Sequence, residues 1–258
     1  MARPVAPGGI TQGPRIARRA SAADNAAMKR RLLLALPQLP QDPASGAART
    51  ARTACEMAAE AGWAVQAVGT TATEGAPLTA PAAWLVAQGI AARDDGTTLR
   101  FEQNGVGYAL LNTGATPWDK WQTRYGDAYD RLFDSALASF RPDAMLTYGG
   151  MPGDLRRHWR ARQAGCRVAF CVFNQGYLNP GRTFDAVDAV LTPSVWVADQ
   201  YRRAIGLDST PLPTRLDFAD VVAPDREPIF VVMVNPSIEK GLYVVARIAD
   251  CLLYTSPS

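Results

Sequence analysis

The sequence contains one histidine, His158, among its 258 residues. A single histidine excludes metal sites built from several histidines, and any Ser-His-Asp triad would depend on that one residue. The sequence also has no D-x-D stretch to offer paired carboxylates to a divalent cation. A G-x-G-x-x-G fingerprint, which marks a dinucleotide site, is absent as well. We therefore expect neither a metal ion nor a bound cofactor.

Cysteine is also scarce, and its spacing matches no metal-binding or redox motif. The four cysteines lie within apolar patterns: Cys55, Cys166, Cys171 and Cys251. Cysteines of this kind act as small buried hydrophobic residues in proteins of a reducing compartment. We therefore expect all four to be buried and the protein to be cytoplasmic.

Long apolar runs are missing, and so is an excess of positive charge over most of the chain. No apolar run approaches the ~20 residues that a membrane-spanning helix needs. The formal net charge is +3, but residues 1–31 contain seven basic residues and one acidic residue. The remainder holds 20 basic and 23 acidic residues, a net charge near −3. This balance argues against a nucleic-acid partner, which needs clustered lysine and arginine.

The first 27 residues differ in composition from the rest of the chain. They are basic and contain few large apolar side chains. Such a segment cannot bury enough surface to offset the entropy lost on folding. We expect residues 1–27 to be a disordered basic tail.

After this tail, strand patterns alternate with helix patterns. Residues 31–37 and 62–70 predict strands. Between them, Gly46 begins a predicted helix whose apolar face includes Ala51 and Cys55. A strand, a helix and a second strand within about forty residues are typical of a parallel unit with a right-handed crossover.

The middle of the chain predicts a hairpin and a long helix. Apolar and polar residues alternate around Asn104-Gly105, a favoured two-residue hairpin turn. Apolar residues then repeat at helical spacing from 118 to 140. Three acidic residues share one face of this helix, and we expect a solvated acidic face there rather than a metal site: Asp127, Asp130 and Asp134.

A second series of parallel elements follows. Residues 143–150 and 167–174 predict strands, with a helix near 153–164 between them. The segment VAFCVF is apolar on both faces, as in the middle of a parallel sheet. A further short strand ends at Ser194, a good N-cap for a helix with Val197, Ala198, Tyr201 and Ile205 facing inward.

These patterns predict an α/β protein with one complete domain. Residues 28–215 form a Rossmann-like parallel sheet with helices on both faces. Residues 216–228, rich in proline and charge, read as a linker. Residues 229–258 predict the first strand and helix of a second Rossmann-like domain, which roughly 150 further residues would complete. We therefore expect the chain to be a fragment of a longer protein.

Three loops follow predicted strands at their carboxyl ends, where α/β proteins place ligands. Gly46 stands at a helix N-terminus that favours a phosphate or an oxyanion, although an isolated glycine also serves merely to let the chain turn. Gly149 and Gly150 precede another helix. Lys240 begins a helix beyond an apolar strand, where its charge and the helix dipole suit a diphosphate; the alternative is a solvated lysine.

The motifs in and around these loops follow a recognisable order: DPASGAART, RPDAMLTYGG, FNQGY, LTPSVWVADQYRRAIGL and VNPSIEKG. Over residues 31–250 they resemble glycosyltransferases of the two-Rossmann (GT-B) type, in particular the retaining enzymes of group 1 or family 4. The resemblance implies a parent enzyme of the hexosyltransferase type that moves a sugar from a nucleotide-sugar donor to a glycan or lipid-linked acceptor, as in polysaccharide biosynthesis. It also implies peripheral membrane association. Because half of such an active site would be absent, we expect this chain itself to be inactive.

The resemblance also assigns roles to residues of the donor site. The C-terminal domain would hold the nucleotide sugar. Lys240 and Gly241 match the segment that grips the donor diphosphate, and Asn235 stands where many members carry an arginine. Ser45 and Gly46 match the glycine loop that faces the donor across the cleft.

The N-terminal domain would hold the acceptor by this resemblance. We expect its cleft to include residues at two strand ends: Tyr148, Gly149, Gly150, Asn174 and Tyr177. No catalytic base is assigned, because the strand end that often carries a histidine reads Tyr-Gly-Gly and His158 lies at least a helix turn too late. The leaving phosphate can accept the acceptor's proton in a retaining transfer, so electrostatic support of that phosphate would do most of the catalysis.

Two rival hypotheses remain open. A nucleotide-sugar epimerase of the same architecture would use the Lys240 loop but would want carboxylates and a histidine in the cleft. A Rossmann-like domain that only binds a partner is the better description if residue 258 is the native end. An E-x7-E pattern about 80 residues or more beyond Lys240, within the rest of a second domain, would favour the transferase.

Overall fold

The computed structural model describes residues 29–151, 153–215, 222, 232–233, 238 and 241–255. The chain divides into two compact units, Met1–Arg215 and Leu216–Ser258, and each is described by itself. The predictions for residues 1–27 and for most of 216–240 lie outside the described residues. Of the strand predicted to begin at 229, only Val232 and Met233 are described, and they form no strand.

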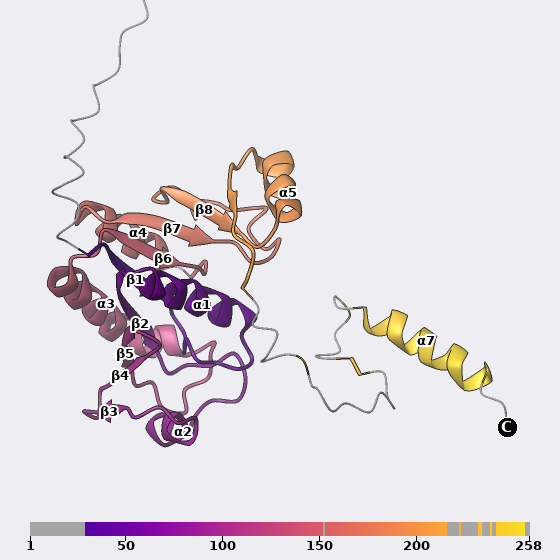
Figure 1. Ribbon diagram of the computed structural model, residues 1–258, viewed down its shortest axis with the longest axis horizontal. Coiled ribbons are helices and arrows are strands. Elements are labelled where there is room, and N and C mark those ends of the chain that lie inside the picture. Colours follow the sequence, from indigo (N-terminus) through magenta and orange to yellow (C-terminus); the bar gives the residue numbers. More distant parts are fainter. Residues whose placement is uncertain are drawn as a thin grey trace, which may run out of the picture. The chain divides into compact units, whose positions relative to one another are not determined.

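The first unit is built on a mostly parallel sheet (Figure 1). Among its described residues, the strand order is β3-β4-β5-β2-β1-β6-β7-β8-β9. β4 pairs antiparallel with β3 and β5, whereas the other neighbouring strands pair in parallel. This architecture confirms the predicted Rossmann-like α/β fold. The strands are β1 (Arg31–Ala35), β2 (Ala64–Thr70), β3 (Arg93–Asp94), β4 (Thr98–Gln103), β5 (Val106–Leu111), β6 (Ala144–Thr147), β7 (Arg167–Cys171), β8 (Ala189–Thr192) and β9 (Thr210–Pro211).

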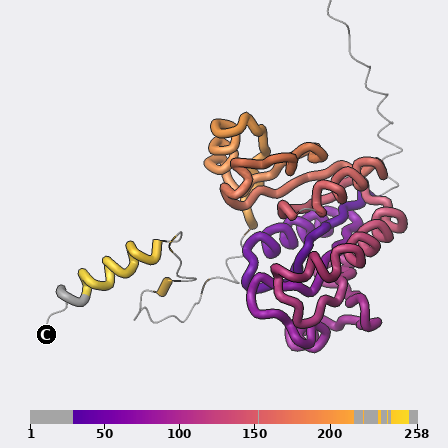
Figure 2. The backbone as a smooth tube through the Cα atoms, turned by 180° about the vertical axis from the view of Figure 1, so that it is seen from behind, coloured from indigo at the N-terminus to yellow at the C-terminus, as the bar shows by residue number. Residues whose placement is uncertain are grey.

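Helices cover both faces of this sheet, as the apolar strands predicted. Successive residues of β1 belong to different cores: Leu34 packs in the cluster that contains Cys55 of α1, and Leu33 in the cluster that contains Phe133 of α3. Figure 1 shows β1 and β2 between α1 and α3, and Figure 2 shows the same unit from behind. The helices of this unit are α1 (Gly46–Glu60), α2 (Pro81–Ala87), α3 (Trp121–Phe140), α4 (Asp154–Gln163) and α5 (Val195–Ile205).

The predicted hairpin joins β4 to β5. Its turn residues Asn104 and Gly105 have φ values of 51° and 74°. Positive φ at both central residues is the conformation of a type I′ turn, which matches the twist of the paired strands. β5 also pairs in parallel with β2, so the hairpin extends one side of the sheet.

Serine caps begin two of the helices. Ser45 Oγ accepts a hydrogen bond from the Ala48 N–H of α1 at 3.2 Å. Ser194 Oγ accepts one from the Val197 N–H of α5 at 3.2 Å, which confirms the predicted cap. As predicted, α5 buries Val197 and Tyr201 against the sheet. Each cap satisfies a backbone donor that the first helical turn leaves without a partner.

The second unit contains α7 (Leu242–Thr255), the helix predicted after Lys240. Cys251 is exposed on this helix, whereas Cys55, Cys166 and Cys171 are buried as predicted. The prediction of a buried Cys251 is therefore wrong. The described part of this unit is α7 and a few isolated residues, which cannot bury the apolar face of a helix.

The acidic face of α3 is only partly solvated. Asp127 and Asp134 are exposed, but Asp130 is 6% exposed and binds guanidinium groups of Arg156 and Arg157 on α4. The prediction of a solvated Asp130 is therefore wrong. Its partners lie on a neighbouring helix, so the residue spacing along α3 could not reveal them.

Candidate functional site

A cleft of about 240 Å³ lies at the carboxyl ends of the central strands. Its walls come from the segments that follow β1, β2, β5, β6 and β7, and from the first turn of α1. β1 and β6 are neighbours, and the chain builds outward from them in opposite directions. Ligands of open α/β sheets bind at such a switch point, outside the carboxyl ends of the strands. The cleft is therefore the candidate functional site.

All five residues predicted for an acceptor cleft line this one: Tyr148, Gly149, Gly150, Asn174 and Tyr177. The first three follow β6 and the other two follow β7, the neighbouring strand. The two segments touch, because a Cβ added to Gly150 would lie only 3.2 Å from Cε1 of Tyr177. The structure thus brings the five together, and their role toward an acceptor stays a prediction.

The loop after β6 is fixed by the first residue of α4. Asp154 Oδ2 accepts a hydrogen bond from the Met151 N–H at 2.8 Å. Gly149 has a φ of 126°, and a Cβ there would lie 2.8 Å from the same carboxylate oxygen. Glycine is therefore required at 149, both for the backbone conformation and for the close approach of Asp154.

A buried ion-pair network holds Asp154 in turn. Arg157 donates to Asp154 Oδ1 at 2.8 Å and to Asp130 Oδ1 at 2.7 Å. The Arg157 guanidinium also lies over the ring of Tyr129, 4.8 Å from its centroid. Burial raises the pKa of Asp154, and the charge of Arg157 opposes that shift. Because these bonds satisfy the buried charges, they stabilise one position of the loop.

The loop after β7 is fixed by Tyr201 of α5. The Tyr201 hydroxyl donates to the Asn174 carbonyl at 2.8 Å and accepts from the Tyr177 N–H at 3.1 Å. Asn174 Oδ1 accepts the Gly176 N–H at 2.8 Å, which closes a local turn. Burial raises the pKa of Tyr177 to about 12, so its hydroxyl keeps its proton at neutral pH.

The first turn of α1 forms another wall. Ser45 Oγ donates to Glu74 Oε1 at 2.8 Å, and the Glu74 N–H donates to Asp42 Oδ2 at 2.7 Å. Gly46 begins α1 and is exposed; a Cβ built on it meets no atom within 4 Å, and its φ is not positive. Neither the fold of this chain nor a turn therefore requires glycine at position 46.

Two buried polar side chains of the cleft lack hydrogen-bond partners among the described residues. Gln38, which follows β1, is 1% exposed and its Nε2 is unpaired; the Tyr148 hydroxyl makes no hydrogen bond of normal geometry. Burial raises the pKa of Tyr148 well above its ordinary value, while nearby Ser45 opposes the rise. Buried polar atoms normally have partners, so both groups call for a hydrogen-bond partner that the described residues do not supply.

Several cleft residues carry no pattern that the sequence analysis could use. Gln38, Glu74 and Trp118 follow three different strands, and nothing in their local sequence distinguishes them from surface loop residues. Phe173 could have been predicted, because it directly precedes Asn174 in the sequence. In the structure its ring packs edge-on against Tyr148, with 5.4 Å between the ring centroids. A rule that collects every residue after a parallel strand would have found all four.

The predicted donor residues are only partly described. Lys240 and Asn235 lie outside the described residues. Gly241 has a φ of 86°, and its carbonyl accepts the Val245 N–H, so it stands where α7 begins. Glycine meets the need for a left-handed residue at that position.

His158 lies outside the cleft. It is 2% exposed on α4, with its ring packed edge-on against Phe170 at 5.9 Å between centroids. Neither ring nitrogen has a partner among the described residues. Burial, assisted by the charge of Arg157, lowers its pKa to about 4, so the ring is neutral at pH 7. It cannot exchange protons with a ligand in the cleft.

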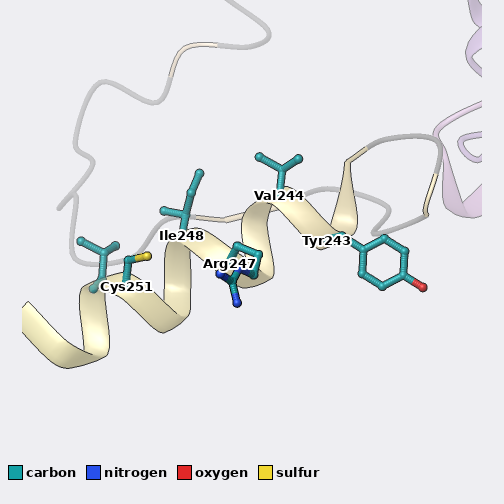
Figure 3. A pocket seen from close by; sticks show the side chains of 6 residues that line it. Tyr243, Val244, Arg247, Ile248 and Cys251 are labelled. Atoms are coloured by element: carbon teal, nitrogen blue, oxygen red, sulfur yellow. The ribbon is translucent and has the colours of Figure 1, made fainter.

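A larger hollow, about 500 Å³, runs along α7 and is lined by residues of that helix alone: Tyr243, Val244, Arg247, Ile248, Cys251 and Leu252 (Figure 3). One helix cannot enclose a ligand, so this hollow is the exposed apolar face of α7. Among the described residues, no helix combines the length and apolar character of a membrane span. Within the same residues, no cluster of three or more His, Cys, Asp or Glu side chains could hold a metal ion.

The comparisons with known proteins concern the fold. No family model and no curated protein matches the sequence. The sucrose-phosphate synthase of Thermosynechococcus elongatus is a structural match at 13% identity and a TM-score of 0.46, over 72% of this chain and 48% of that one. The α,α-trehalose 6-phosphate synthase of Burkholderia multivorans matches at 14% identity and 0.37, over 69% and 41%.

The UDP-GlcNAc 2-epimerase of Methanocaldococcus jannaschii also matches, at 10% identity and a TM-score of 0.37, over 67% of this chain and 42% of that one. The chain therefore spans less than half of the length of each of these three proteins.

Proposed function

We propose that this chain is the acceptor-side part of a glycosyltransferase that moves a sugar from a nucleotide-sugar donor to a hydroxyl of a glycan or lipid-linked acceptor. One observation carries the proposal: five loops and the start of α1 form a single cleft at the switch point of the sheet. The five residues that the resemblance assigns to an acceptor cleft all lie in it. The reaction class, glycosyl transfer, is inferred from the resemblance that the order of the sequence motifs carries.

In this proposal, the start of α1 faces the donor diphosphate. The N–H groups of Gly46 and Ala47 belong to the first helical turn, and no described residue accepts a hydrogen bond from them. A side chain at position 46 would meet no other atom of the described residues within 4 Å of its Cβ, yet the residue there is glycine. Close approach of a ligand to the backbone is a reason for glycine that the fold itself does not supply, and it supports an anion site there.

The second unit is proposed to carry residues that bind the donor diphosphate. Lys240 and Gly241 precede α7, so an ammonium and a helix N-terminus would act on the same diphosphate. Asn235 would add a neutral hydrogen-bond donor. Their combined field favours the charge that grows as the sugar–phosphate bond breaks. We propose retention of the sugar's configuration, with the leaving phosphate accepting the acceptor's proton.

The two rival functions receive less support. An epimerase of this architecture was expected to use carboxylates and a histidine, but His158 is in the core and Glu74 is the one carboxylate among the described cleft residues. A domain that only binds a partner would need no unpaired amide inside a cleft, whereas Gln38 has one. A small-molecule site accounts for both observations better.

The experiment is an assay of the longer protein that an extended reading frame would encode. We expect release of nucleoside diphosphate from one of the UDP-, GDP- or ADP-sugars, dependent on an added glycan or lipid-linked acceptor. The anomeric configuration of the product, read by NMR, tests retention. No acceptor-dependent release from the whole donor panel contradicts the transferase, and epimerised donor without acceptor supports the rival enzyme. The 258-residue chain is the control and is expected to be inactive.

A further inference from the structure

The charge of the cleft bears on what it can hold. Among the described residues that line it, Glu74 is the one charged side chain, and no lysine, arginine or histidine is present. A phosphate or carboxylate placed there would lose water, gain no counter-charge and face Glu74 at short range. The start of α1 offers the nearest positive field, but the proposed function already assigns its Gly46 and Ala47 N–H groups to the donor diphosphate. Ser45 also holds the Glu74 carboxylate beside that helix start, which makes the rest of the cleft unfavourable for a second anion. The cleft therefore disfavours an anionic occupant.

The polar groups of the cleft instead complement hydroxyl groups. Gln38 Nε2 is a buried amide donor without a partner among the described residues. Glu74 Oε1 is engaged by Ser45, and no described residue donates to Oε2, which is left as an acceptor. Asn174 uses its Oδ1 internally, so its amide N–H groups are the part it can offer. A hydroxyl both donates and accepts, so a ring with neighbouring hydroxyls can satisfy this mixture.

The remaining surface is largely aromatic. Trp118, Tyr148, Phe173 and Tyr177 line the cleft, and Trp118 and Tyr177 are partly exposed to it. Aromatic faces bury the C–H surface of a flat ring while polar groups at its rim bind the hydroxyls. The volume of about 240 Å³ lies below the roughly 300–1,000 Å³ typical of drug-sized sites. It therefore suits a single sugar ring rather than an extended chain.

We propose that the cleft binds one uncharged pyranose ring of the acceptor, with hydroxyls held by the Gln38 amide and the Glu74 carboxylate, and that it rejects rings bearing a phosphate or carboxylate. The word acceptor rests on the proposed function, but the binding preference is a property of this cleft alone. Gln38 and Glu74 are thus specificity-determining residues, and Ser45 positions the Glu74 carboxylate.

The test measures binding to the 258-residue chain without any donor. Saturation-transfer NMR and chemical-shift titration are applied to methyl glycosides of glucose, galactose, mannose and N-acetylglucosamine, and to methyl glucuronide and glucose 6-phosphate. Glu74→Gln, Gln38→Ala and the control Glu102→Gln on the exposed face of β4 are measured in parallel. Circular dichroism and thermal unfolding confirm that each variant is folded.

We expect at least one neutral glycoside to bind, and both anionic sugars to bind at least tenfold more weakly. Gln38→Ala weakens the neutral ligand at least fivefold. Glu74→Gln reduces the difference in affinity between neutral and anionic sugars, which a merely structural role would not do. Glu102→Gln changes neither the affinity for neutral sugars nor that for anionic sugars. Anionic sugars that bind as well as neutral ones, or no binding by any glycoside, overturn the inference. Neutral binding here without transfer by the longer protein leaves the inference standing and refutes the proposed function.

Discussion

Asp154 binds the Met151 N–H with one carboxylate oxygen and Arg157 with the other, each at 2.8 Å. One side chain thus joins a buried ion-pair network to the backbone of a loop that lines the cleft. The shape of this wall depends on charged side chains that do not themselves line the cleft. Stability and ligand binding can therefore be separated by choosing which partner to change.

Asp154→Ala is expected to destabilise the protein by about 3–5 kcal/mol, because it leaves the Arg157 guanidinium buried with one carboxylate instead of two. Urea unfolding measures the change. Asp134→Ala is the matched control: Asp134 pairs with Arg160 at the surface, so its loss should cost less than about 1 kcal/mol. Equal losses from the two variants would show that the network does not hold the loop.

Gly149→Ala is expected to cost about 2–4 kcal/mol, since the left-handed backbone is strained for alanine and its Cβ would meet Asp154. Gly165→Ala separates the two causes. Gly165 also has a positive φ, 81°, but its Cβ position is open, so only the backbone strain of about 1 kcal/mol remains. Thermal unfolding of both variants gives the comparison. A Gly149→Ala protein as stable as Gly165→Ala would argue against the close approach of Asp154.

Gly46→Ala should leave stability unchanged or raise it by up to about 1 kcal/mol, because alanine fits the open, non-strained start of α1. In the longer protein, the same change should lower kcat/KM for the nucleotide sugar at least about tenfold, since the methyl group stands where the diphosphate approaches. Donor titrations at saturating acceptor measure this. Unchanged donor kinetics would show that the glycine has no ligand to accommodate.

The pH dependence of stability should carry a contribution from His158. Its pKa in the folded protein, about 4, lies below the ordinary value of 6.5. Between these values the unfolded chain takes up a proton that the folded chain does not, so stability is complete above pH 6.5 and falls as the pH decreases toward 4. His158→Leu removes this contribution, about 3 kcal/mol in full. Chemical unfolding of both proteins at pH 7, 5.5 and 4 should show a smaller loss of unfolding free energy for the variant as the pH falls. Equal losses in the two proteins would refute the lowered pKa of His158.

Lys240→Ala in the longer protein is expected to reduce the transfer rate about 30- to 1,000-fold, or about 2–4 kcal/mol, by removing a charge that supports the departing diphosphate. Lys240→Arg should recover part of the rate, because it keeps the charge and changes the reach. Lys120→Ala is the control, since Lys120 is exposed and pairs only with Asp119 among the described residues. Near-normal kcat/KM for Lys240→Ala would contradict the diphosphate role and favour the alternative, a solvated lysine.

The fold was predictable because its signals are local and repeated. The apolar strands, the Asn104-Gly105 turn and the Ser194 cap each act within a few residues, and the structure confirms them. The family resemblance also placed Tyr148 and Asn174 in one cleft, and both line it. Local signals could not reveal Asp130 or Gln38. The burial of Asp130 depends on arginines of α4, and the unpaired amide of Gln38 depends on four other loops that share its cleft.

The two edges of the sheet are each only two residues long. β3 consists of the exposed charged pair Arg93 and Asp94, and β9 ends in Pro211, which has no N–H to donate. A long bare edge invites another chain to add a strand, whereas charge, proline and shortness each oppose that addition. The outermost strands of the described sheet, β3 and β9, are therefore poor sites for the addition of a strand from another chain. On the β3 side, residues Phe101–Gln103 of β4 extend past the pairing with β3, so this short stretch is the backbone that another copy meeting that edge would encounter.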